Sequence, residues 1–213
     1  EDARSEQQSA SPQGNATLQG ALFKVTYSVS GETTLRTWVF STDSQGFVSF
    51  DADHKVSGDD LFTLGEKPWL PLGYYQIEEI QAPEGYKLPE HSLQTWKLSN
   101  QNGNLIWTNL SSGKENSSSE HSFTFKDEVI RGNLKVKKIG HTSLSSPDGY
   151  SEAEEMPSLK GAKIELTNSS AQPIFYQGKW IAPHEVVTTV ETDESGVAAI
   201  KDLPFGSYSL KEV

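Results

Sequence analysis

The chain has 213 residues, a length that suits one or two domains. Its formal net charge of −11 argues against nucleic acid or an anionic membrane as partner, and its lack of cysteine excludes disulfides, thiolate catalysis and zinc–thiolate sites. No apolar run reaches the roughly 18–20 residues of a membrane span, and the polar opening EDARSEQQSASPQG has no signal-peptide pattern. We therefore expect a mature or excised part of a protein that functions outside the cell.

Short segments of alternating polar and apolar residues predict strands along the whole chain. In chain order they are LFKVTYSV (22–29), RTWVFST (36–42), FVSF (47–50), YYQIEEI (74–80), LQTWKLS (93–99), NLIWTNL (104–110), HSFTFKD (121–127), NLKVKKI (133–139), AKIELTN (162–168), VVTTVETD (186–193) and YSLKEV (208–213). They are rich in β-branched and aromatic residues and are separated by Gly, Asn, Ser and Asp, which is typical of antiparallel sandwiches. The polar stretches 111–121 and 141–158 predict loops.

Three sequence blocks occur twice in the same order. LQGALFKV (18–25) matches LKGAKIEL (159–166), STDSQGFVSF (41–50) matches ETDESGVAAI (191–200), and LPLGYYQIEE (70–79) matches LPFGSYSLKE (203–212). The repeat predicts two copies of one β unit, with domains at 1–130 and 131–213 and an insertion at 51–69 in the first.

The repeat also predicts which of two adjacent glutamates is buried. In the second copy Tyr208, Leu210 and Glu212 share one strand face, and this apolar face is expected to point inward. The aligned residues of the first copy are Tyr75, Ile77 and Glu79. Glu79 is therefore expected inside and Glu78 outside.

The duplicated blocks, followed in the first copy by APEGY (82–86), resemble the B-type repeats of collagen adhesins. These are also called SpaA-type or prealbumin-like pilin domains and occur in Gram-positive surface adhesins and pilins. The resemblance implies two tandem Ig-like β-sandwiches, the second lacking its last strand. It also implies an isopeptide bond between a lysine on the first strand and an Asn or Asp on the last, assisted by a buried glutamate.

Carried over to this sequence, the resemblance assigns the assisting role to Glu79 and Glu212. Asp127 takes the acceptor position of the first domain, and Lys138 takes the nucleophile position of the second. Lys24 is expected to face outward, so the first domain has no candidate lysine, and the second domain ends before any acceptor. We therefore expect no intramolecular isopeptide bond in these 213 residues, which an intact mass would test.

Simpler interpretations exist for each of these residues. The two glutamates could be ordinary strand-end residues, Lys137 competes with Lys138, and Asp127 could belong to a turn. The acidic insertion could bind calcium, although a solvated loop is favoured, through Asp51, Asp53, His54, Asp59 and Asp60. Trp38, Trp96 and Trp107 are expected in the core or on a sheet face, whereas Trp69 and Trp180 are candidates for an exposed platform.

The expected function is that of a non-enzymatic stalk or spacer in a secreted, wall-anchored adhesin or pilus-like protein. Its chemistry would be limited to autocatalytic bond formation, without cofactor or metal. Its expected partners are neighbouring repeat domains. Two alternatives are a ligand-binding module that recognises a host protein or glycan, and an accessory domain of a secreted glycan-active enzyme.

Overall fold

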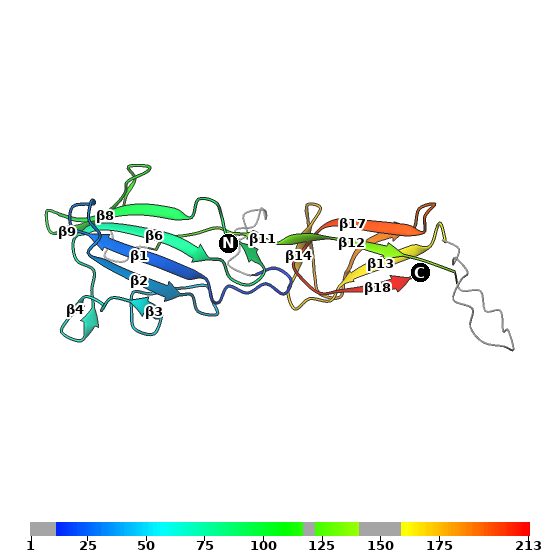
Figure 1. Ribbon diagram of the computed structural model, residues 1–213, viewed down its shortest axis with the longest axis horizontal. Helices are drawn as coiled ribbons and strands as arrows, with labels where there is room; N and C mark the ends of the chain where they lie inside the picture. The colour runs from blue at the N-terminus through cyan, green and yellow to red at the C-terminus, as the bar shows by residue number, and fades with distance from the viewer. Residues whose placement is uncertain (1–11, 117–121, 141–158) are drawn as a thin grey trace. The chain divides into compact units, whose positions relative to one another are not determined.

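The computed structural model describes residues 12–116, 122–140 and 159–213. Over these residues the chain is all-β, and it divides into two compact units. Unit 1 contains Ala16–Val129, and unit 2 contains Ile130–Val213 together with the short segment Gln13–Asn15. Figure 1 shows both units and labels most of their strands. The described residues contain no helix long and apolar enough to cross a membrane.

Unit 1 is built on a seven-stranded antiparallel sheet in the order β10-β9-β8-β6-β1-β2-β3. Its strands are β1 (Leu22–Ser28), β2 (Arg36–Ser41), β3 (Lys55–Gly58), β6 (Gly73–Gln81), β8 (Leu93–Gln101), β9 (Asn104–Asn109) and β10 (Glu115–Asn116). Two further pairs lie outside this sheet: β4 (Thr63–Leu64) with β5 (Lys67–Pro68), and β7 (Tyr86–Lys87) with β11 (Glu128–Val129).

Alternation along these strands gives the sheet one apolar and one polar face. Trp38, Phe40 and Tyr75 are each at most 2 % exposed on the apolar face. This face is covered largely by side chains from irregular segments, which pack against it as partly buried hydrophobics: Phe50, Leu61, Phe62, Leu70, Phe123 and Phe125. The core is therefore mainly aromatic, and its side chains meet in tilted and edge-to-face ring pairs.

Several sequence predictions for unit 1 are wrong in detail. Residues 47–50 form no strand, and no described segment pairs with them. The aligned residues 197–200 of unit 2 do form a strand, because they pair with residues 134–137. The insertion 51–69 was not predicted to contain strands, yet it forms β3, β4 and β5. Within 121–127, the described residues 122–126 carry no ladder strand, although Phe123 and Phe125 do face the core.

Unit 2 encloses a smaller, aliphatic core. Its strands are β12 (Arg131–Lys137), β13 (Lys163–Asn168), β14 (Ile174–Tyr176), β15 (Lys179–Ile181), β16 (Val186–Glu191), β17 (Val197–Pro204) and β18 (Tyr208–Glu212). They form the sheets β12-β17, β16-β13-β18 and β14-β15. Leu166, Ile174 and Ile200 are at most 2 % exposed between them.

Strand register shows that the two units repeat the same arrangement. In unit 1, β1 and β6 place Phe23 opposite Glu79 and Val25 opposite Ile77. In unit 2, β13 and β18 place Ile164 opposite Glu212 and Leu166 opposite Leu210. The residues that pair in unit 2 are therefore the ones that the sequence repeat aligns with the paired residues of unit 1.

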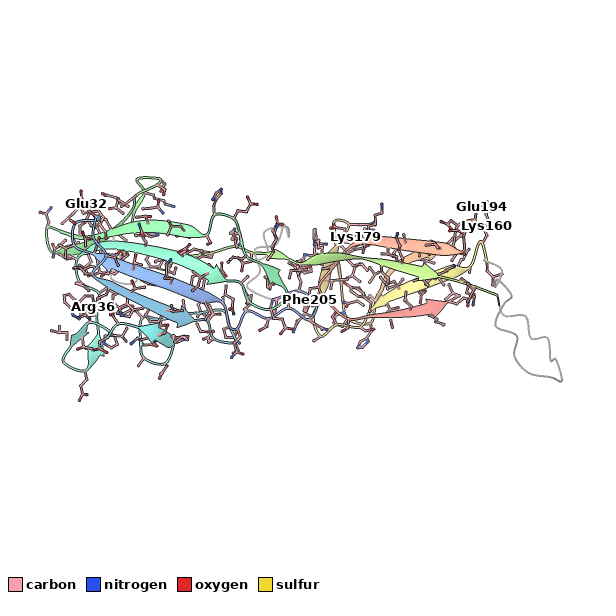
Figure 2. All side chains as sticks on the ribbon, in the orientation of Figure 1. Glu32, Arg36, Lys160, Lys179, Glu194 and Phe205 are labelled. Carbon is pink, nitrogen blue, oxygen red and sulfur yellow. The ribbon has the colours of Figure 1, made fainter. Side chains whose placement is uncertain are left out.

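The duplicated blocks also make the same hydrogen bonds. The Thr42 hydroxyl donates to Leu18 O and accepts from Ala21 N–H, and Thr192 does the same with Leu159 O and Ala162 N–H. After each threonine, an aspartate accepts from the turn that follows, which lowers the pKa of Asp43 and Asp193. In unit 2 an ion pair between Lys160 and Glu194, labelled together in Figure 2, also joins the two blocks.

The motif L-P-x-G-x-Y has a second duplicated bond. The Tyr75 hydroxyl donates to Pro71 O at 2.6 Å, and the Tyr208 hydroxyl donates to Pro204 O at 2.7 Å. Burial raises the pKa of both tyrosines. Each tyrosine thus closes the turn that leads into the strand carrying Glu79 or its repeat equivalent, Glu212.

The segment Gln13–Asn15 completes unit 2, which the repeat does not indicate. Gln13 is fully buried, and its Oε1 accepts from Phe175 N–H at 2.8 Å. Gly14 N–H donates to Pro173 O, and Gln172 N–H donates back to Gly14 O. A Cβ on Gly14 would lie 2.2 Å from Phe205 O, so only glycine fits at this point.

Candidate functional site

Two carboxyl groups lie together in the core of unit 1. Glu79, on β6, is 2 % exposed, and Asp127, directly before β11, is 9 % exposed. β11 pairs with β7, where Val129 lies opposite Tyr86. The APEGY segment thus holds the chain that carries Asp127, while strand alternation turns Glu79 inward.

Aromatic residues and a backbone clamp enclose this pair. The Phe23 ring, on the residue opposite Glu79, lies 4.9 Å from that of Phe125, two positions before Asp127. Ser92 fixes the backbone of Glu79, because its hydroxyl donates to Glu79 O at 2.7 Å and its own carbonyl accepts from Glu79 N–H at 3.3 Å. No sequence pattern indicated this role for Ser92.

Burial makes both carboxyl groups weaker acids than usual. Burial and the neighbouring Asp127 charge raise the pKa of Glu79 to about 8, and burial raises the pKa of Asp127 as well. The two side chains share a hydrogen bond that favours the neutral form of Glu79 and the charged form of Asp127. Glu79 therefore holds the proton and donates it toward Asp127 near neutral pH.

The pair leaves hydrogen-bonding capacity unused. Among the described residues, Glu79 Oε2 and Asp127 Oδ1 are buried without a hydrogen-bond partner. Such atoms are rare in folded proteins and are commonly explained by a missing ligand or a reactive role. No described lysine contacts either carboxyl group, and Lys24 lies on the opposite face of the sheet, where its Nζ is 2.5 Å from Glu78 Oε2.

Unit 2 brings together the other half of the predicted site. Lys138 Nζ lies 2.5 Å from Glu212 Oε2. The burial of β12 alternates so that Leu134 and Val136 are partly buried and Lys135 and Lys137 are exposed, which puts Lys138 on the inward side. These two side chains remain 34 % and 49 % exposed, in contrast to Glu79.

Unit 2 also has an apolar groove beside β18, which neither Lys138 nor Glu212 lines. It has a volume of about 420 Å³ and is lined by apolar side chains that include Leu134, Leu203, Tyr208 and Leu210. In unit 1 the corresponding side of β6 is covered by Phe125, whereas Leu210 of β18 is 45 % exposed. The structure thus pairs Glu79 with Asp127 in one unit and Lys138 with Glu212 in the other.

The acidic insertion does not form a cation site within the described part of the chain. No group of three or more His, Cys, Asp or Glu side chains there is arranged to hold a metal ion. Asp51 instead accepts from the His54 ring and backbone, and Asp59 accepts from Thr37 N–H. Asp51 and Asp59 therefore act as hydrogen-bond acceptors, Asp51 in a turn and Asp59 at the end of a strand pair.

The tryptophans are divided between core and surface. Trp38, Trp96 and Trp107 are buried in unit 1, whereas Trp69 is 45 % exposed. Trp180 lies on the short strand β15 and is partly buried, with its ring 5.4 Å from that of Phe175 in a tilted arrangement. Neither β14 nor β15 was predicted, because the Gln-Gly pair at 177–178 was not recognised as a turn. These two residues, both with positive φ, form the hairpin that joins the strands.

The sequence of the chain matches a known family of domains. The sequence model of the SpaA prealbumin-like fold domain matches residues 10–113 and 151–213. Among solved structures, a chain described as the Bacillus anthracis TIE protein is similar with a TM-score of 0.45 and 24 % sequence identity. That similarity covers 93 % of this chain and 25 % of the other, so this chain spans about a quarter of that protein's length. No curated protein matches.

Proposed function

Because the chain belongs to the family of SpaA prealbumin-like fold domains, we propose that it is a stalk or spacer segment of a Gram-positive surface protein. In this proposal each unit is stabilised by an intramolecular isopeptide bond. The observation that carries it is the buried pair Glu79–Asp127, with a raised pKa at Glu79 and unpartnered oxygens on both carboxyl groups.

The chemistry follows from the environment of the pair. An unprotonated lysine amine attacks the Asp127 carboxyl carbon, and an amide forms with loss of one water. Glu79 first gives its proton to the Asp127 carboxylate. It then takes up the proton that the attacking amine releases and passes it to the departing hydroxyl, which leaves as water. The aromatic surroundings favour the neutral amine because burial lowers the pKa of a lysine.

In unit 2 the proposed roles belong to Lys138 and Glu212. Their contact at 2.5 Å places the amine next to the assisting carboxylate. The acceptor would be an Asn or Asp on a strand seated in the apolar groove beside β18, as Phe123 and Phe125 bring Asp127 to Glu79 in unit 1. Neither proposed bond can be completed by the side chains that the structure describes.

The benefit of such bonds is mechanical. A covalent link between the first and last strands lets a pulling force bypass the hydrogen bonds of the sheet. Closing a loop of about 100 residues is also worth roughly 4–5 kcal/mol in chain entropy. A segment of this kind would hold a distant binding domain away from the cell wall.

Single-molecule force spectroscopy on a longer version of the protein, with further residues on both sides, tests the proposal. With the bond in place, the force–extension curve should contain no unfolding step for unit 1. Glu79→Gln should prevent the bond from forming, so the step should appear. Glu78→Gln is the matched control, because Glu78 lies outside the core, and it should behave like the unaltered protein. A full unfolding step of unit 1 in the unaltered protein would refute the proposal.

A further inference from the structure

The segment that leads to Asp127 lies on the unit 1 sheet without joining its ladder. Phe123 and Phe125 pack against the apolar face, yet residues 122–126 form no ladder strand. Apolar contacts are not directional, so ring packing alone does not fix where along the sheet this segment stops. The distance between Asp127 and Glu79 depends on that position, because Asp127 follows the segment directly.

An amide side chain connects this segment to the sheet. Gln94 lies near the start of β8, and its Nε2 donates to Thr124 O at 2.9 Å. Its Oε1 accepts from Trp96 Nε1–H at 3.2 Å. An indole N–H can only donate and a carbonyl oxygen can only accept, so these two partners fix the orientation of the amide. The Trp96 ring also meets the Phe123 ring edge to face at 5.0 Å.

Gln94 occupies a position where strand alternation predicts an apolar residue. Register places it opposite Ile77, and β8 buries Trp96 and Leu98 on the same face. A polar side chain on the core-facing side of a sheet is costly unless its hydrogen-bonding groups are used. Both ends of the Gln94 amide are used, one of them on segment 122–126. A leucine or methionine would serve packing alone, so the amide itself has a role.

The start of β8 holds both parts of the chain that carry the acid pair. The Ser92 hydroxyl bonds the backbone of Glu79, and Gln94, on the same strand face, bonds the carbonyl of Thr124. Thr124 precedes Asp127 by only three positions. β8 lies beside β6 in the sheet (Figure 1). One strand therefore sets the position of Glu79 and of the segment that leads to Asp127.

We propose that Gln94 is a positioning residue for the bond-forming site of unit 1. It holds segment 122–126 where the Asp127 carboxyl group meets Glu79, and Trp96 keeps the Gln94 amide in the orientation that this requires. Gln94 acts through the Thr124 carbonyl and not on a reacting atom. The inference rests on the isopeptide chemistry proposed above, but the alignment of the two carboxyl groups can be measured without that bond.

The pKa of Glu79, measured by NMR of isotope-labelled carboxyl carbons in the 213-residue chain, tests this alignment. Burial and the neighbouring Asp127 charge raise this pKa to about 8. Gln94→Met keeps the length of the side chain but removes both hydrogen bonds, so Asp127 should move away and the Glu79 pKa should fall. It should stay above 4.5, because burial remains. Gln76→Met, at an exposed position on the other face of β6, is the matched control and should leave the pKa unchanged.

A second background shows whether Gln94 acts through Asp127. In Asp127→Asn, which lacks the acidic partner, Gln94→Met should no longer change the Glu79 pKa. A general loosening of unit 1 would lower the pKa in both backgrounds. The proposal is overturned if the change persists in Asp127→Asn, or if Gln94→Met leaves the pKa at its unaltered value. Should Gln94→Met not fold, Gln94→Asn decides, because its amide is one methylene too short to reach both partners.

The rate of the mass loss at Asp127 tests the consequence for the reaction, in the longer version of the protein sampled at intervals after cell-free synthesis. Gln94→Met should slow this loss by about fivefold, which corresponds to the roughly 1 kcal/mol that one hydrogen bond contributes. Gln76→Met should not slow it. An unchanged rate in Gln94→Met would overturn the proposal. If the unaltered longer protein loses no water, the proposed function fails, and the Glu79 pKa alone decides the role of Gln94.

Discussion

At the scale of single residues, the acid pair makes the stability of unit 1 depend on pH. The pKa of Glu79 is raised from 4.5 to about 8, so the folded state keeps a proton that the unfolded chain releases. Folding therefore takes up protons between about pH 4.5 and 8, and the free energy of unfolding falls as the pH rises through this window. The raised pKa of Asp127 acts in the same direction.

Urea titrations monitored by tryptophan fluorescence, which reports mainly on unit 1, can measure this slope. Four of the five tryptophans lie in that unit. Glu79→Gln removes the titrating group and should flatten the decline, whereas Glu78→Gln should leave it. If the free energy of unfolding changes with pH in the same way in the unaltered protein and in Glu79→Gln, then Glu79 has an ordinary pKa.

The inward direction of Glu79 could be predicted because strand alternation and the repeat both indicate it. Its contact with Asp127 could be suggested only by the family resemblance, since the two are far apart in the chain. Ser92 and Gln13 could not be found, because each acts through a hydrogen bond to the backbone of a distant segment. Serine and glutamine at such positions have no local sequence signal.

At the scale of structural elements, the duplicated threonines connect the start of each repeat to its T-D-x-x-G turn. Thr192 is 3 % exposed and makes two hydrogen bonds, so Thr192→Val should destabilise unit 2 by about 1–3 kcal/mol. Thr42→Val should have the same effect on unit 1. Thr189→Val, at an exposed position of β16, should stay within about 0.5 kcal/mol. Equal stability of Thr189→Val and Thr192→Val would refute this role.

Residues 13–15 act as an additional element of unit 2. Gln13→Ala leaves the partly buried Phe175 N–H without its acceptor, which should cost about 1–3 kcal/mol. Hydrogen exchange should show faster exchange at Phe175 in this variant, with Leu98 of the unit 1 core unchanged. Gln19→Ala, at an exposed position, is the control. Unchanged exchange at Phe175 in Gln13→Ala would show that the segment does not stabilise unit 2.

Element prediction succeeded where alternation was long and a partner strand was present. The nine residues of β6 have a clear period of two and pair on both sides. The FVSF stretch has the same period, but no described segment pairs with it, whereas the aligned residues 197–200 pair with residues 134–137. The strand-like alternation of 122–126 does orient Phe123 and Phe125 correctly, although no neighbouring strand pairs with them.

At the scale of the whole molecule, the two units repeat one fold and contain different pairs of ionisable side chains. Unit 1 buries Glu79 with Asp127, and unit 2 pairs Lys138 with Glu212, to which we assign the proposed isopeptide roles. The tandem duplication could be predicted from three ordered blocks, whereas the membership of residues 13–15 in unit 2 could not.

The intact mass of a longer version of the protein, extended at both ends, tests the central claim most directly. We predict that it is lower than the calculated mass by one water for the bond at Asp127, together with one water or one ammonia for a bond at Lys138. Glu79→Gln should abolish only the mass loss at Asp127, and Glu212→Gln only the mass loss at Lys138. Glu78→Gln should leave both losses in place. A mass equal to the calculated value in the unaltered protein, or a loss at Asp127 that persists in Glu79→Gln, would contradict the account.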